Sequence, residues 1–427
     1  MRLAKRILIT NYILDQGSGT EMYVHDLALS LLSNGRLPIV YCPRPGLLFR
    51  RLQELGVCVV DDLAQIGAPP DVIHGHHSLE TIAAAMRFPM CPTLFVCHDC
   101  STWYDTAPSL PNIIKYVAVD QACYDRMVFQ HGISPDQLQI IPNGVDLSRF
   151  PLRAGLPARP RSILCFGHSF REEYVEQVRQ AAPAFHVESI GISTNRNLVE
   201  PGPWLGKFDI ILARGRSARE AIATGAATIV ADIMGVGDMV TSNNYSDFQT
   251  NNFGRRLLRK AFSVESVRGA VAQYDAEDAW QVAIQHRQQN SLAEIVQLFE
   301  SIYDQLLDDF RPESVPSDAW SRHASKWLQW SSLHANVVLP SQPNGQHPKM
   351  PPIEEPIYPE SEKNLSESST VFQAEHCKDS PTEESFASEA TSPEGEQKIG
   401  EKRDTHPTSI RLYRVVSRTL EKLRKIS

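Results

Sequence analysis

The stretch that most restricts the fold is 208–232, FDIILARGRSAREAIATGAATIVAD, which predicts a strand, a turn, a short helix and a second strand. Phe208–Leu212 and Ala227–Ala231 are apolar runs of the length typical of buried parallel strands. Ala218–Thr224 is helical in composition, and Gly225 is placed to end that helix. Such a unit puts a helix N-terminus at the carboxyl end of a parallel strand, where α/β folds bind anions and nucleotides.

Glu220 in this stretch allows two interpretations. Ser217 is a candidate N-cap, and Glu220 stands three residues later, which is the spacing of a capping box. Alternatively, the Glu220 carboxylate binds a ribose or sugar hydroxyl, while Arg214 or Arg216, on either side of Gly215, binds phosphate. The stretch by itself does not distinguish the two.

Composition excludes several classes of protein. The 427 residues suffice for two or three domains, and a hydrophobic content of 42% suffices for cores over most of the chain. The formal net charge of −8 argues against broad nucleic-acid binding. No apolar run approaches the ~20 residues that span a membrane. The N-terminal MRLAKRILITNYIL lacks a small-residue cleavage site and predicts a first strand rather than a signal peptide.

Two clusters have the residue types of metal sites without the spacing. His74, His76 and His77 follow one another closely, but no carboxylate or thiolate partners stand at a recognisable distance. Cys97 and Cys100 form a C-x-x-C pair without a second pair. We therefore expect free thiols in a reducing cytosol and no bound metal.

Residues 1–150 predict a first Rossmann-like domain, in which short apolar strands alternate with helices. A glycine-rich turn follows the first strand, and its backbone amides can approach a ligand closely; it contains Gly17, Ser18, Gly19 and Thr20. His98 ends a later strand, Thr93–Cys97, and so faces the ligand crevice of such a fold. Asn143 and Gly144 form a sharp turn before a Pro- and Arg-rich linker.

Residues 151–310 predict a second α/β domain, and the character of the chain changes after residue 310. The first strand of this domain, Ser162–Phe166, precedes a helix at Phe170–Ala182, and the composition of 243–253 predicts a polar loop. Closing helices end with Ser291–Phe310, whose apolar residues recur at helical spacing. We expect a short Trp-containing helical segment at 311–339, a disordered linker at 340–409, and a basic amphipathic helix at 410–427.

These motifs resemble glycosyltransferase family 4 (glycosyl transferases group 1), a retaining family with the GT-B fold. The most specific match is IIPNGVDLSRF at Ile140–Phe150, which resembles the family's signature before the linker. The DVIHGHHS and FVCHD segments resemble its strand-end histidines, and GRSAREAIATGAATIVAD resembles its donor-site helix and strand. The resemblance covers about 6–310 and implies two Rossmann-like domains with closing helices and a disordered tail outside it.

The donor half departs from the family pattern at two places. The family commonly has two glutamates eight positions apart; Glu220 matches the second, and Leu212 stands at the first. Where the family places Arg and Lys after the first strand of its second domain, this chain has His168 and Arg171. Two alternatives therefore stay open: a catalytically inactive GT-B-like binding or scaffolding protein, and a sugar-nucleotide epimerase.

The resemblance implies an enzyme, a hexosyltransferase-like glycosyltransferase (EC 2.4) that moves a sugar from a nucleotide-sugar to a glycan or lipid-linked acceptor in polysaccharide biosynthesis. It implies no metal or other cofactor, and no nucleic-acid partner. It assigns His98 and Glu220 to catalysis, Gly17–Thr20 to the cleft loop, and Asn143 and Gly144 to the part of the site near the linker. It assigns donor binding to Arg171, Arg214, Gly215, Arg216, Ser217 and Glu220.

The C-terminal segment 410–427 generates a first test. Its leucine and valine face and its many Arg and Lys residues predict one of two states: a helix that binds an anionic membrane surface or a protein partner, or a weakly helical solvated tail. We expect a cytoplasmic protein, and in the first state one that associates peripherally with the inner face of the membrane. Removing this segment is expected to reduce co-sedimentation with anionic liposomes. Equal sedimentation of the full-length and truncated proteins would contradict this.

Overall fold

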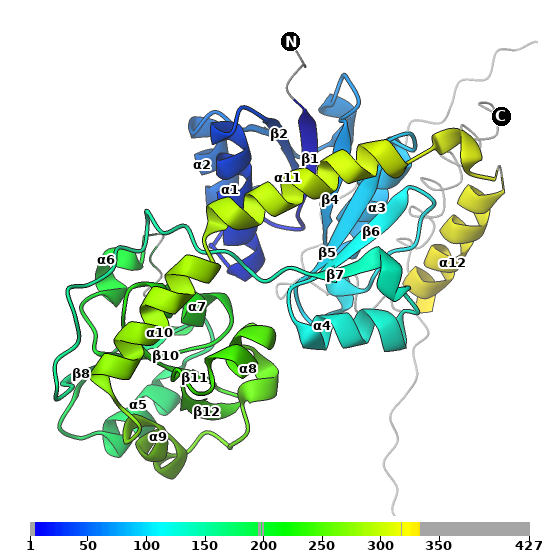
Figure 1. Cartoon of the computed structure of the whole chain (residues 1–427). Helices are drawn as coiled ribbons and strands as arrows, with labels where there is room; N and C mark the ends of the chain where they lie inside the picture. The colour runs from blue at the N-terminus through cyan, green and yellow to red at the C-terminus, as the bar shows by residue number, and fades with distance from the viewer. Residues whose placement is uncertain (1–4, 195–197, 199, 317, 334–427) are drawn as a thin grey trace, which may run out of the picture. The chain divides into compact units, whose positions relative to one another are not determined.

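Two mainly parallel sheets with flanking helices form the described part of this computed structural model (Figure 1). The predicted α/β class with two Rossmann-like units is confirmed. The predicted segments 340–409 and 410–427 lie outside the described residues. The structure describes residues 5–194, 198, 200–316 and 318–333.

The first sheet has seven strands in the order β3-β2-β1-β4-β5-β6-β7, and each neighbouring pair is parallel. The chain builds outward from β1 to β3 and then adds β4 on the other side of β1. The order thus reverses between β1 and β4, where α/β sheets open a crevice for ligands. The strands are β1 Arg6–Thr10, β2 Leu37–Tyr41, β3 Cys58–Val60, β4 Val72–His76, β5 Thr93–Cys97, β6 Ile113–Ala118 and β7 Leu138–Ile140.

Helices α1 to α4 pack on the first sheet, and local sequence explains where α1 begins. Glu21 accepts a hydrogen bond from the Ser18 amide at 3.3 Å, as in a capping box. Gly17, just before, has a φ of 79°, which glycine adopts without strain. Helix α4 is followed directly by a π-helical turn, Arg126–Gln130. The bounds are α1 Gly19–Ser33, α2 Leu47–Glu54, α3 Ser78–Arg87 and α4 Gln121–Asp125.

The second sheet has the order β12-β11-β10-β8-β9, and its order reverses between β8 and β10. Its neighbouring strands are parallel except β12, which is antiparallel to β11. The strands are β8 Ser162–Phe166, β9 His186–Ile190, β10 Ile210–Ala213, β11 Ala227–Asp232 and β12 Gly235–Met239. The helices of this part are α5 Glu172–Ala181, α6 Gly202–Leu205, α7 Arg216–Ala223, α8 Tyr245–Thr250, α9 Val264–Val271 and α10 Ala276–Gln289.

Part of 233–253 is more regular than its sequence predicts. The edge strand β12 has the sequence GVGDM, whose glycines are unfavourable in strands, and it forms because β11 offers a partner. The prediction of a polar loop over 243–253 is wrong in its centre, where α8 lies. Tyr245 and Phe248 of α8 are buried in the core of this lobe. The many asparagines of 243–253 led to the prediction of a loop, although these two aromatic residues anchor a helix.

Helix α11, Leu292–Asp309, leaves the second sheet and packs on α1 and β4 of the first (Figure 1). The chain crosses itself where this helix begins: the Val145 amide donates to the Asn290 carbonyl, and the Leu292 amide donates to the Val145 carbonyl, both at 2.9 Å. The predicted boundary at 310 grouped α11 with the second domain, but its apolar face belongs to the first core. Helical spacing identifies a buried face and cannot say which sheet covers it.

Helix α12, Ala319–Leu333, lies in the predicted Trp-containing segment. Trp320 and Trp327 pack against the first core. Among the residues that the structure describes, no helix combines the length and apolar character that a bilayer-spanning segment needs.

The packing of α11 generates a stability test. Phe299 of α11 is fully buried in the first core, so Phe299→Ala is expected to lower the free energy of unfolding by about 3–5 kcal/mol. The neighbouring Leu298 is 37% exposed, and Leu298→Ala is the matched control, expected to cost less than about 1 kcal/mol. Urea denaturation measures both. Equal losses from the two variants would show that α11 is not anchored through Phe299.

Candidate functional site

A cavity of about 320 Å³ lies where strand ends of both sheets meet, and we call it the smaller cavity. The loops after β8 and β10, which flank the order reversal of the second sheet, form one part of its wall. Segments after β1, β5, β6 and β7 of the first sheet form another. Its walls therefore come from the carboxyl ends of parallel strands, where this fold type binds ligands. Lining residues include Gly19, Thr20, His98, Asp99, Asn143, His168, Arg214, Gly215, Arg216, Ser217, Asn252, Arg255 and Arg256.

Helix α7 presents its first turn to this cavity. The predicted N-cap, Ser217, is wrong: the helix begins at Arg216 and its N-cap is Gly215. Gly215 has a φ of 60°, which glycine adopts readily, and this turn lets the helix start two residues earlier. Glu220 therefore closes no capping box. Its carboxylate instead accepts a hydrogen bond from Nε of Arg216 at 2.7 Å.

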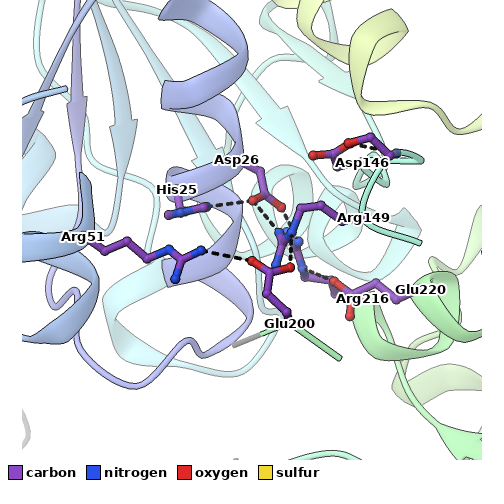
Figure 2. A network of polar contacts seen from close by, with 9 residues as sticks. His25, Asp26, Arg51, Asp146, Arg149, Glu200, Arg216 and Glu220 are labelled. Carbon is purple, nitrogen blue, oxygen red and sulfur yellow. Dashed lines mark hydrogen bonds and ion pairs between the residues drawn. The ribbon is translucent and has the colours of Figure 1, made fainter. Parts of the chain in front are cut away.

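Arg216 joins the two sheets through a buried charge network (Figure 2). Its guanidinium also binds Asp26 of α1, with Nη2 2.5 Å from Oδ2. Asp26 accepts a second bond from Arg149 at 2.8 Å, and it lies 2.9 Å from Nδ1 of His25. The side chains of Asp26, Arg216 and Glu220 are at most 10% exposed. No signal in the sequence marked Asp26, which stands in the middle of helix α1.

The charges of this network set the protonation of its members. Burial favours neutral Asp26, but the charges of Arg216 and Arg149 and the hydrogen bond from His25 outweigh it and lower the pKa of Asp26 to about 2. Burial raises the pKa of Glu220, although Arg216 opposes the shift. Burial also disfavours charged Arg216, yet its two carboxylates raise its pKa above the ordinary value. At neutral pH the Arg216–Asp26 pair is therefore ionic.

A second cavity, of about 810 Å³, adjoins the first and is called the larger cavity. Arg216, Ser217 and Gly19 line both cavities, and Glu220 lines only the larger one. Apolar residues from the end of β9 and the loop after it, Ile190, Ile192 and Leu198, line its second-sheet side. A ligand with an apolar ring system and an anionic group could therefore occupy both cavities at once.

The structure brings most of the predicted site residues together and leaves two outside. Of the cleft loop, Gly17 and Ser18 line the larger cavity, and Thr20 lines the smaller one. Arg171 lines neither cavity, because it precedes α5 with its side chain 62% exposed and 3.6 Å from Glu173. Gly144 also lines neither. A Cβ at this position would come within 2.8 Å of Cα of Leu292, so Gly144 permits the crossing of the chain.

His98 is held by a second histidine. Its Nε2 lies 2.8 Å from Nδ1 of His76, and the two rings pack on Tyr23. His74 and His76 are fully buried within β4, and His77 follows its end. Burial lowers the pKa of His98 well below its ordinary value, so His98 meets a ligand as a neutral group.

The described residues hold no group of three or more His, Cys, Asp and Glu side chains placed to bind a metal ion. The imidazoles of His74, His76 and His98 instead contact one another and aromatic rings. The seven cysteines in the described ranges are free thiols, and Cys377 lies outside them.

Sequence reasoning missed three arginines around these cavities. Arg149, next to last in the Ile140–Phe150 signature, links Asp26 to Glu200. Arg255 and Arg256 follow Gly254 in the smaller cavity's wall. Their adjacent positive charges just after the 243–253 segment were the available signal.

Comparison with known proteins agrees with this geometry. The family described as Glycosyltransferase Family 4 matches residues 17–149, which include the cleft loop, His98 and the Asn143 turn. No curated protein matches the chain in sequence.

Several solved structures are similar to this chain in fold. A glycosyltransferase from Rickettsia africae has a TM-score of 0.52 at 14% identity, over 72% of this chain and 100% of that one. HepE from Anabaena in complex with UDP has a TM-score of 0.54 at 13% identity, over 70% and 100%. Its complex with UDP-glucose gives 0.53 at 14%, over 70% and 100%. The predicted resemblance to GT-B glycosyltransferases of family 4 is confirmed for the fold.

The network around Arg216 generates a test of stability against pH. Asp26→Asn is expected to lower the free energy of unfolding at pH 7 by about 3 kcal/mol, because it deprives a buried guanidinium of one carboxylate. The folded pKa of about 2 lies below the ordinary 3.8. The contribution of Asp26 is therefore present above about pH 4 and lost as the pH falls towards 2.

Urea unfolding of wild type and variant from pH 7 to pH 3 checks both claims. The difference in the free energy of unfolding between wild type and Asp26→Asn is expected to decrease as the pH falls. Glu200→Gln is the matched control: the Glu200 side chain is 47% exposed, and its loss is expected to cost less than about 1 kcal/mol. A difference independent of pH, or equal costs for both variants, would contradict an ionic role for Asp26.

Proposed function

We propose that this protein is a retaining glycosyltransferase that moves a hexose from a nucleotide-sugar to a glycan or lipid-linked acceptor. The observation that carries the proposal is the smaller cavity, which joins the strand ends of both sheets and has the first turn of α7 in its wall. The GT-B-like fold and the family match over 17–149 support it. The complexes of HepE with UDP and UDP-glucose support a nucleotide-sugar as the donor.

In this proposal the donor spans both cavities. Its nucleoside occupies the larger cavity between the apolar side chains after β9 and the Gly17–Gly19 loop. Glu220, which lines that cavity, binds a ribose or sugar hydroxyl with its carboxylate. The diphosphate then lies beside Ser217, which belongs to both walls, against the first-turn amides of α7.

The chemistry of transfer follows from charge. Negative charge grows on the departing diphosphate as the glycosidic bond breaks, and fixed amide dipoles with a guanidinium stabilise it without reorganising. Arg214 lies in the same wall, where its guanidinium is paired with Asp232. Neutral His98, held by His76, contacts the transferred sugar and fixes its position. The proposed reaction uses no metal and no protein nucleophile.

One observation favours a second candidate, a GT-B-like binding protein without transferase activity. Leu212 stands where the family has its first glutamate, and it is fully buried within β10. This position therefore offers no carboxylate to a donor sugar. Both candidates bind a nucleotide, and only the enzyme cleaves the donor, so binding and cleavage must be measured separately.

The test is a thermal-shift panel of UDP, GDP, ADP and CDP with their sugar derivatives, followed by donor hydrolysis. One diphosphate is expected to raise the melting temperature, since a ligand at 100 times its Kd stabilises by about 2.7 kcal/mol. For that donor, His98→Gln is expected to lower hydrolysis about 10²-fold while the shift remains, because His98 positions the sugar and not the nucleotide.

His186→Gln is the matched control, because His186 is an exposed histidine of the second sheet paired with Glu188. It is expected to change neither readout. Nucleotide binding without any donor cleavage would favour the inactive binding protein. An epimerised sugar in place of the released one would indicate an epimerase, and no shift with any nucleotide would refute both binding proposals.

A further inference from the structure

The segment 251–256 forms a strained wall of the smaller cavity. Asn252 and Phe253 have φ angles of 49° and 53°, in the left-handed region that residues with side chains rarely adopt. Two such residues in succession, one of them a phenylalanine, persist only where the surroundings impose them. Strain of this kind concentrates at ligand-binding segments. Asn251, Asn252, Gly254, Arg255 and Arg256 of this segment line the cavity.

Contacts with helix α7 and the turn before it hold Asn252 and Phe253 in this left-handed conformation. The guanidinium of Arg219 donates to Oδ1 of Asn252 at 3.0 Å and lies 5.5 Å from the centre of the Phe253 ring. The Gly215 amide donates to the Phe253 carbonyl at 2.8 Å. The turn before α7 and the 251–256 segment are therefore fixed to each other, on two sides of one cavity.

Arg219 also adds an uncompensated charge to this wall. It is fully buried, and among the described residues its guanidinium bonds to amide oxygens of Asn252 and Asn290 rather than to a carboxylate. Buried charges are ordinarily paired. The positive potential of Arg219 is therefore weakly screened and reaches the cavity through Asn252, where it favours an anion.

Arg255 and Arg256 add exchangeable positive charge at the cavity rim. Their side chains are 42% and 45% exposed, and their partner carboxylates, Asp99 at 3.4 Å and Asp125 at 2.6 Å, are 25% and 29% exposed. Arg255 also donates a hydrogen bond to Oγ of Ser101 at 2.7 Å. Oδ1 of Asp99 is already occupied by hydrogen bonds from Ser101 and Thr102. Exposed ion pairs contribute little to stability. A bound anion can therefore take these two guanidinium groups at small cost.

The other cavity arginines are held more firmly. Arg216 is shared between buried Asp26 and Glu220, and Arg214 lies 2.5 Å from buried Asp232. Separating such pairs leaves a buried carboxylate without its partner. The 251–256 segment is therefore the part of the wall whose arginines can change partners.

We infer that Arg255 and Arg256 bind the diphosphate of the nucleotide-sugar, opposite the first turn of α7. This inference rests on the proposed function. The phosphate binding that the sequence assigned to Arg171 is thus carried out by the 251–256 segment. The strained turn at 252–253 positions these arginines at the smaller cavity. The diphosphate then replaces Asp99 and Asp125 as their partner.

The test compares a nucleoside diphosphate with its monophosphate, using the pair whose diphosphate gave the largest thermal shift in the panel of UDP, GDP, ADP and CDP. Isothermal titration of the full-length protein with R255Q/R256Q is expected to show at least about a tenfold rise in the diphosphate Kd, because charge-assisted hydrogen bonds are lost. The monophosphate Kd is expected to change by less than about twofold, which separates phosphate recognition from altered lobe contacts.

Arg259→Gln is the matched control. Arg259 is three residues from Arg256, pairs with Asp247 at 3.0 Å, is 61% exposed and does not line the cavity. It is expected to leave both constants unchanged. An unchanged diphosphate Kd in R255Q/R256Q, or an equal rise for the monophosphate, would overturn the inference and leave the proposed function standing. Failure of wild type to bind any nucleoside diphosphate would overturn both.

Discussion

A buried guanidinium on α7 connects the two halves of the described structure. Arg216 cannot be left without partners in an environment that excludes water, and its own helix supplies only Glu220. The other carboxylate, Asp26, comes from α1 of the first sheet. Both sheets must therefore be in place before this charge is satisfied. The junction is held by directional polar contacts, and Arg216 lines both cavities.

The arginines that line the cavities therefore have different roles. A guanidinium that two buried carboxylates hold is a good structural bridge and a poor source of charge for an incoming anion. The amides of the first turn of α7 and the exposed arginines of 251–256 are not bound to two buried carboxylates in this way. The smaller cavity thus has one rigid wall, the first turn of α7, which would position a ligand. Its other wall, the 251–256 segment, carries arginines that can exchange their carboxylate partners for a ligand. Binding of a diphosphate in a cleft of this kind depends on both.

Sequence reasoning succeeded where one local signal decided the outcome. Strands such as Thr93–Cys97 and Ser162–Phe166 were predicted with the bounds that they have, because apolar runs between turns leave few alternatives. It failed where a tertiary partner decided. GVGDM became a strand because β11 lay beside it, and the candidate N-cap Ser217 lies inside α7 because the helix begins directly after Gly215. Arg171 was placed in the site by analogy, and it points to solvent.

By itself the sequence determined the two Rossmann-like units, the bounds of strands such as Thr93–Cys97, and the loops that follow these strands. These features depend on hydrophobic periodicity and turn residues, which act over a few positions. Only the tertiary structure decided that α11 belongs to the first core, that Asp26 binds Arg216, and that a strained turn fixes Arg255 and Arg256 beside the cavity. Asp26 and Arg216 are 190 positions apart. No local pattern can encode such a pair, because the contact exists only after both sheets have formed.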